Sequence, residues 1–313
     1  NNKKVDKGQS AGGRIRAIYL PSDNWKLDFN VSYEYGDQGG YPYGLYNKET
    51  GDVAKTAYND ESSYYRNLLN AGLNVEYQAQ NFTLSAVTGY QHLKDRMFLD
   101  QDFTAKNTYT LEQKQRINTI SEEIVMKSKE SHRWQWATGI FGFYQWLNTT
   151  APVTFKEDGM AMMDQMLGNF IPALVEVPMG PGRNMNIMPA LKVTSARLPI
   201  NGALFHQSTF RDLFGIDGVS FTAGLRLDYE KMKMDYNSGT AMDYTIGITG
   251  QMMMNGAPTG KPISMMPETA LTVTSRYQSS ISKDYLQLLP KFALQYDFPK
   301  NLGNVYATVS KGY

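Results

Sequence analysis

The sequence contains no cysteine, which excludes a disulfide framework and thiolate metal sites. It also has no run of about 18 apolar residues, so a transmembrane helix is excluded. The net charge is +1 over 313 residues, without the basic excess that a nucleic-acid-binding surface needs. Such a length holds one or two soluble domains, or about half of a large barrel.

Catalytic signatures are also missing. The sequence has no Gly-x-Ser-x-Gly elbow, no His-Glu-x-x-His motif and no P-loop. The three histidines, His92, His132 and His206, are not paired at metal-ligand spacing. The sequence therefore predicts a protein that is not an enzyme and holds no metal or cofactor.

Tyrosine is abundant, with 21 residues, although the mean hydropathy is low at −0.45. Residues 25–35 alternate strictly, with Leu27, Phe29 and Val31 on one side and Lys26 and Asp28 on the other. A period of two predicts a β-strand with one apolar and one polar face. The apolar face could cover a soluble core or contact lipid, and the pattern alone does not choose.

Similar segments recur along the whole chain. Strands are predicted at 14–20, 25–35, 67–78, 82–91, 117–126, 133–146, 202–210, 219–230, 288–298 and 305–313. Their connections are alternately short and long, with the long ones at 36–66, 93–114, 148–200 and 234–280. Membrane barrels have this arrangement, with short periplasmic turns and long extracellular loops. A soluble sandwich has no reason to place every long loop at one end, so the spacing favours a membrane barrel.

Several strands carry specific motifs. Residues 288–298 read LLPKFALQYDF, and after a short turn 304–313 read NVYATVSKGY; residues 222–230 read TAGLRLDYE. These runs resemble strands of the TonB-dependent outer-membrane receptors, most of all the branch that handles iron complexes. Pro290 lies inside a predicted strand, which in a soluble sheet would demote that strand to an edge.

The resemblance implies an all-β fold, an antiparallel transmembrane β-barrel. About ten of that family's 22 strands would lie here, so residues 1–313 would be a partial barrel domain, with the plug domain and the other strands absent at both ends. A cut barrel has two open edges, which lipid does not tolerate. We therefore expect the isolated chain not to fold stably in a membrane; a soluble monomer that unfolds cooperatively would contradict this.

The resemblance also implies a function. Such receptors import a scarce nutrient, here a ferric siderophore or similar small-molecule chelate, across the outer membrane of a Gram-negative bacterium. The partners would be outer-membrane lipid and the TonB–ExbB–ExbD complex, which pulls on the plug. Cobalamin, haem and glycan cargoes stay open, the last through a SusC-like importer, although the FRAP and NPNL motifs of haem receptors are absent. A passive pore, a surface-binding barrel and a soluble β-rich module are the alternatives from other classes.

The predicted loops supply the candidate ligand contacts. They are Tyr41, Tyr43, Tyr46, Met160, Met163, Met252, Met253 and Met254. Tyrosine rings stack on chelates or sugars, and thioethers form adaptable surfaces or bind Cu(I). The simpler interpretation is that the methionines pack the loops, partly in a short helix over 158–171, and that the tyrosines belong to an aromatic girdle.

Charged residues on the polar side of the strands are predicted to face the lumen. They are Lys26, Asp28, Glu34, Glu76, Arg226, Asp228, Glu230, Lys291 and Asp297. In a receptor of this family such residues would line the lumen and meet the plug. The simpler interpretation is a hydrated polar wall.

Overall fold

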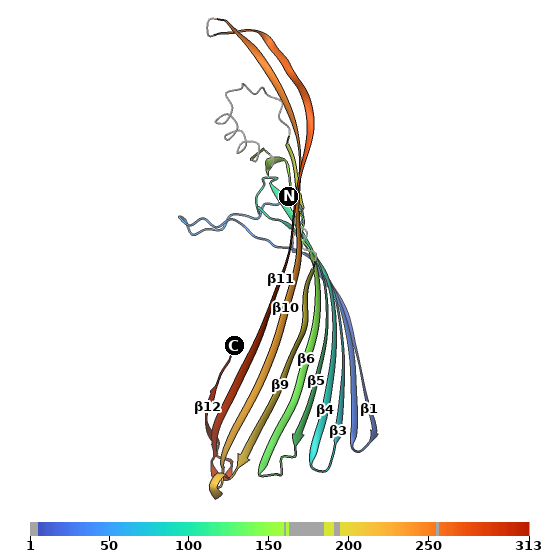
Figure 1. Cartoon of the computed structure of the whole chain (residues 1–313), viewed down its shortest axis with the longest axis vertical. Coiled ribbons are helices and arrows are strands. Elements are labelled where there is room, and N and C mark those ends of the chain that lie inside the picture. The colour runs from blue at the N-terminus through green and yellow to red at the C-terminus, as the bar shows by residue number, and fades with distance from the viewer. Residues whose placement is uncertain (1–5, 160, 163–184, 191–194, 255–256, 313) are drawn as a thin grey trace.

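The chain folds into one antiparallel sheet in a computed structural model. The structure describes all residues except 1–5, 160, 163–184, 191–194, 255–256 and 313. Figure 1 shows the long strands running side by side in a twisted, curved wall. The sheet has 12 strands, in the order β1-β2-β3-β4-β5-β6-β9-β10-β11-β12, with β7 paired to β5 and β8 to β10.

The strands are β1 (Gly8–Ser22), β2 (Trp25–Gly39), β3 (Ser63–Gln78), β4 (Phe82–Asp100), β5 (Tyr109–Ser128), β6 (Trp134–Thr150), β7 (Val153–Phe155), β8 (Met185–Ala190), β9 (Ser195–Arg211), β10 (Val219–Met254), β11 (Ala257–Asp297) and β12 (Asn304–Ser310). Two short 3₁₀ turns, η1 (Leu213–Gly215) and η2 (Pro299–Asn301), lie between strands. Among the described helical segments, none has the length and apolarity to cross a membrane.

The ten strands of the main path correspond to the ten predicted from alternation, which confirms the all-β fold class. The strands are longer than predicted, however. Much of the predicted loop 93–114 is strand, since β4 runs to Asp100 and β5 starts at Tyr109. The predicted loop 234–280 is a β-ribbon, with β10 and β11 paired from Asn237↔Gln278 out to Met254↔Ala257. Hydrogen bonds between two strands do not require an apolar face, so strands can continue where the alternation that predicts them has ended.

Short turns gather at one end of the sheet. They span residues 23–24, 79–81, 129–133, 212–218 and 298–303, and they lie at the lower end of the sheet in Figure 1. Two of them use glycines in conformations that other residues rarely adopt, Gly218 (φ +82°) and Gly303 (φ +131°). The opposite end carries the longer connections 40–62 and 101–108 and the projecting β10–β11 ribbon.

The register gives the sheet two chemically different faces. The apolar face exposes large side chains on most of the long strands, among them Ile15, Phe29, Ile124, Ile140, Leu225, Phe292 and Val309. Among residues whose side chains the structure describes, Leu99 is the one large apolar residue that is buried. An apolar surface of this extent is not stable in water, whereas lipid would cover it.

Aromatic residues mark both limits of the apolar face. At the short-turn end, the rings of Trp25 and Tyr77 lie 4.7 Å apart and those of Trp134 and Phe210 stack at 6.4 Å. Tyr33 lies eight residues beyond Trp25 on the same face, and Tyr90, Tyr144 and Tyr229 occupy similar positions on other strands. Eight residues span ~27 Å of strand, or about 21 Å across a sheet tilted by ~40°. That spacing is close to the ~25 Å apolar band of membrane barrels.

Candidate functional site

The second face of the sheet is polar and collects the predicted lumen residues. Register places all nine of them on this face: Lys26, Asp28, Glu34, Glu76, Arg226, Asp228, Glu230, Lys291 and Asp297. The alternation therefore predicted correctly which side chains share a face. That this face lines a lumen stays a prediction.

Many charges on the polar face are paired with a neighbouring strand or residue. Arg16 on β1 holds Asp28 on β2 through both carboxylate oxygens, with Nε 2.8 Å from Oδ1. Arg66 pairs with Glu34 across β2 and β3. Arg226 Nε lies 2.6 Å from Asp228 Oδ1, and Asp228 is buried, as Asp28 is. The two buried acids of the polar face, Asp28 and Asp228, are thus neutralised by arginines, which is the arrangement that burial of a charge requires.

The Arg16–Asp28 pair provides a test of this wall. Replacing Arg16 with Met should lower the free energy of unfolding by about 1–3 kcal/mol, because a buried carboxylate loses its partner. Arg14, two residues away on the same face, has no ion pair in the described part of the chain, and R14M should cost less than about 0.5 kcal/mol. Urea titration of the full-length protein, refolded in detergent, measures both changes. Equal losses in the two variants would show that the pair contributes nothing specific.

A groove of about 340 Å³ opens on the polar face farther along the sheet. Arg226 and Lys291 lie on its β10 and β11 sides, and Glu123 and Phe205 contribute from β5 and β9. Unlike the paired acids, Lys291 is exposed and forms no ion pair among the described residues. The groove therefore offers positive charge beside an aromatic ring.

An aromatic cluster lies at the end of the sheet opposite the short turns. The centre of the Tyr43 ring lies 6.0 Å from the centre of the Tyr41 ring and 5.2 Å from the centre of the Phe103 ring, which it meets edge to face. The Tyr43 backbone N–H donates to the Tyr58 hydroxyl at 3.0 Å. We call Tyr41, Tyr43, Tyr58 and Phe103 the mouth cluster. Tyr43 is 54% exposed, so the cluster presents an aromatic surface to solvent.

Asp100 joins the two connections that carry the mouth cluster. Its Oδ2 accepts the backbone N–H groups of Asn59 (2.7 Å) and Asp60 (3.3 Å), while its own N–H donates to Ser62 Oγ at 3.1 Å. The carboxylate is 2% exposed. These bonds fix residues 59–62 against the end of β4, and therefore place Tyr58 near the connection that carries Phe103.

Two residues of the mouth cluster also have unusual backbone conformations. Tyr41 (φ 56°) and Phe103 (φ 53°) both adopt left-handed conformations, which bulky residues rarely do. Such conformations persist where surrounding contacts fix them, and they concentrate at functional sites. Asp212, Phe214 and Lys300 also have positive φ, in the short turns at the opposite end of the sheet, so this strain agrees with a site at the mouth cluster but is not confined to it.

Burial raises the pKa of Tyr41 and of Tyr58 above the ordinary tyrosine value, and neighbouring acids raise it further. Both phenols are therefore neutral at physiological pH. Neutral phenols stack on planar groups and exchange hydrogen bonds. The mouth cluster thus suits contact with the organic part of a ligand more than direct coordination of a metal by phenolate.

The structure separates the three predicted tyrosines. Tyr41 and Tyr43 lie together, whereas Tyr46 is 62% exposed and pairs through its backbone with Val53. Phe103 and Asp100 were not predicted, whereas Tyr58 lies in the tyrosine-containing loop predicted at 36–66. Phe103 carried a local signal, since it is the single aromatic residue in the polar connection 101–108; Asp100 carried none.

The methionine candidates are described only in part. Met160 and Met163 lie outside the described residues. Met252, Met253 and Met254 belong to the end of β10, opposite 257–259 of β11, and their side chains lie outside the description. Of the helix predicted over 158–171, the described residues 158–159 and 161–162 are helical. Within the described residues there is no group of three or more acids and histidines that could hold a metal.

The two faces, the aromatic limits and the sorting of turns define the class of the protein: a sheet of the outer-membrane β-barrel type. A family model described as "TonB dependent receptor-like, beta-barrel" matches residues 8–313. The chain belongs to this family, whose members are outer-membrane proteins of Gram-negative bacteria. The resemblance in the strand motifs is thereby confirmed. A search of curated proteins found no match.

A solved structure shares the fold of this chain. The ferric yersiniabactin uptake receptor FyuA from Yersinia pestis has a TM-score of 0.55 and 13% identity, over 96% of this chain and 37% of FyuA. For the unliganded ferric citrate transporter FecA, the TM-score is 0.41 and the identity is 10%, over 98% of this chain and 51% of FecA. For BauA, the ferric preacinetobactin receptor from Acinetobacter baumannii, the TM-score is 0.38 and the identity is 8%, over 97% of this chain and 61% of BauA. The chain thus spans between about a third and two thirds of the length of these proteins.

Proposed function

We propose that this chain forms part of the wall of an outer-membrane transporter that imports a ferric siderophore or a similar metal chelate. Import would be driven by the TonB–ExbB–ExbD complex acting through a plug domain. The observation that carries the proposal is the family match over residues 8–313. FyuA, whose fold this chain shares, is described as a ferric yersiniabactin uptake receptor, which makes a ferric chelate the first cargo to test.

The two faces support a transport role. The apolar face would contact lipid and the polar face would line the lumen, as in other barrels of this type. Paired charges such as Arg16–Asp28 and Arg226–Asp228 make much of the polar face locally neutral. Such a wall is hydrated without holding a passing ligand or a moving plug at one strong charge. Arg14 and Lys291, which are exposed and form no ion pair among the described residues, are exceptions.

The mouth cluster supports the class of ligand. Four aromatic residues gather where the extracellular connections meet the sheet, which is where a chelate would arrive. Stacking of each ring on a planar organic group is worth about 0.5–1.5 kcal/mol beyond the apolar area it buries. The neutral phenols of Tyr41 and Tyr58 would add hydrogen bonds. Met160, Met163 and Met252–Met254 remain proposed contacts from the outer parts of the chain.

Iron-limited growth tests the proposal. A strain that lacks the gene for this protein is given single ferric chelates as the iron source, with and without the gene restored. We expect growth on one chelate class to require the gene, and to be lost in a strain lacking TonB. Uptake that persists without TonB would contradict energised transport and would indicate a passive pore; restored growth on a glycan and on no chelate would contradict the proposed cargo.

A further inference from the structure

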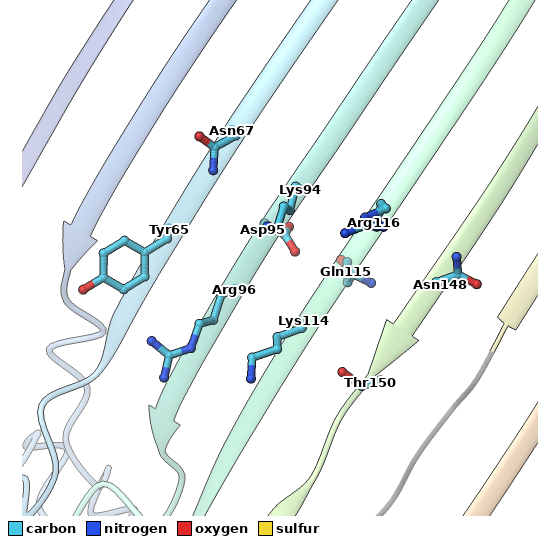
Figure 2. Close-up of a pocket in the computed structure, with 10 residues that line it drawn as sticks. All are labelled: Tyr65, Asn67, Lys94, Asp95, Arg96, Lys114, Gln115, Arg116, Asn148 and Thr150. Carbon is cyan, nitrogen blue, oxygen red and sulfur yellow. The ribbon is translucent and has the colours of Figure 1, made fainter.

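Four cationic side chains lie together on the apolar face of the sheet. Lys94 and Arg96 come from β4, and Lys114 and Arg116 come from β5; all four are exposed. They line an open groove of about 510 Å³, in which Figure 2 shows them flanked by side chains from β3 and β6. Charges are not expected on a surface that contacts acyl chains, because each Lys or Arg near the midplane costs about 2–4 kcal/mol.

The register forces these cations against one another. Lys94 lies directly opposite Arg116, and Arg96 directly opposite Lys114. Like charges in directly opposite positions destabilise a sheet. Glu112 relieves the second pair, with contacts of 2.6 Å to Arg96 and 3.0 Å to Lys114. Within the described part of the chain, Lys94 and Arg116 have no such acid, so the first pair is left to repel unless an anion binds there.

Neutral donors complete the groove. Asn67, Lys94, Arg116 and Asn148 form one row across β3–β6, and Tyr65, Arg96, Lys114 and Thr150 form the next. Arg96 lies 6.0 Å from the centre of the Tyr65 ring, a cation–π distance that helps to hold the guanidinium. Three carboxylates lie nearby: Asp95 is among the lining residues, Glu112 contacts Arg96 and Lys114, and Asp37 lies opposite Tyr65 in register. Four positive charges therefore outnumber three negative ones. Amides and hydroxyls beside clustered cations are suited to phosphate oxygens.

The depth of the groove indicates where the anion comes from. Lys94 lies four residues beyond Tyr90, on the side away from the short turns. Four residues advance ~14 Å along a strand, or about 10 Å across a sheet tilted by ~40°. Aromatic belts sit at the level of lipid headgroups. The cations therefore lie at and just above the headgroups, on the face that lipid contacts.

We propose that this groove binds the phosphorylated headgroup of a lipid in the outer leaflet, with Lys94 and Arg116 contacting a phosphate. The occupant is a membrane lipid and not free phosphate, because the groove opens sideways above the apolar face, where the acyl chains of the same molecule would lie. The inference depends on the proposed membrane location, but it does not depend on the transported ligand.

Native mass spectrometry of the purified, detergent-solubilised full-length protein tests the proposal. The probes are lipid A, which carries two phosphates, its dephosphorylated form, phosphatidylethanolamine and inorganic phosphate. We expect lipid A to bind the unaltered protein preferentially. The variant K94Q/R116Q should weaken this binding about 10- to 30-fold, since each cation near a lipid surface contributes about 1 kcal/mol.

The control variant is K48Q/K55Q, which removes two exposed lysines from the connection 40–62. It should bind lipid A as the unaltered protein does. Equal weakening in both double variants would overturn the site, because it would show non-specific attraction. If K94Q/R116Q does not fold, the unaltered protein still decides: equal binding of lipid A and its dephosphorylated form, or displacement of lipid A by millimolar inorganic phosphate, would overturn the proposal. Chelate uptake by cells that produce these variants reports separately on transport.

Discussion

Replacing Ile124 with arginine is expected to lower the free energy of unfolding by about 2–4 kcal/mol. Ile124 lies on the apolar face opposite Ala86 of β4 and Ile140 of β6, roughly midway between the two aromatic limits. Glu122 lies two residues away on the same face, where it accepts a hydrogen bond from Thr88. An arginine at position 124 would have to pair with this carboxylate among acyl chains or bend the surrounding lipid to reach water. Equilibrium unfolding in urea from lipid vesicles measures the change.

Val125 provides the matched control one residue along β5. It lies on the polar face, in the same row as Ser85 and Gly139 and two residues from Glu123. An arginine at Val125 would enter the proposed hydrated lumen beside an acid, so V125R should cost less than about 1 kcal/mol. A larger loss in V125R than in I124R would contradict the assignment of the two faces to lipid and lumen.

Removing two rings of the mouth cluster is expected to weaken chelate binding about 10- to 100-fold. In the variant Y43A/F103A, the edge-to-face contact at 5.2 Å disappears, and with it the exposed aromatic surface. Two aromatic contacts together contribute about 1–3 kcal/mol, and a loss of about 1.4–2.8 kcal/mol within that range corresponds to a 10- to 100-fold change in affinity. Equilibrium binding of the chelate identified in the growth assay, measured by quenching of intrinsic fluorescence, gives the affinity.

The comparison variant for the mouth cluster is L45A/V53A. Both residues are exposed, at 56% and 64%, in the same connection, and neither belongs to the cluster. Their removal should leave the affinity unchanged within about twofold. If both double variants lose affinity equally, the connection 40–62 acts through its general shape and the cluster is not the site of stacking.

Alternation and the strand motifs together were sufficient to locate the ten main strands. Alternation also separated the faces of most of them, but not of residues 133–146, where both sides are apolar, and residues 117–126 carry Glu122 on the same face as Ile124. A period of two is a local property, so Asp28 and Phe29 lie on opposite faces whatever β2 pairs with. For that reason all nine predicted polar residues share a face in the structure. The sorting of short and long connections also required no structure, because it follows from counting residues between strands.

Only the tertiary structure decided which side chains meet across the sheet. Phe103 is 60 residues from Tyr43, and their contact depends on how two connections are joined through Asp100. Lys94 faces Arg116 because of the β4–β5 register, and a shift of one residue would place Arg116 on the opposite face. The β10–β11 ribbon likewise depends on pairing and not on an apolar pattern. Local sequence therefore determined the strands and their faces, whereas the mouth cluster and the cationic groove arose from register and loop contacts between residues distant in the chain.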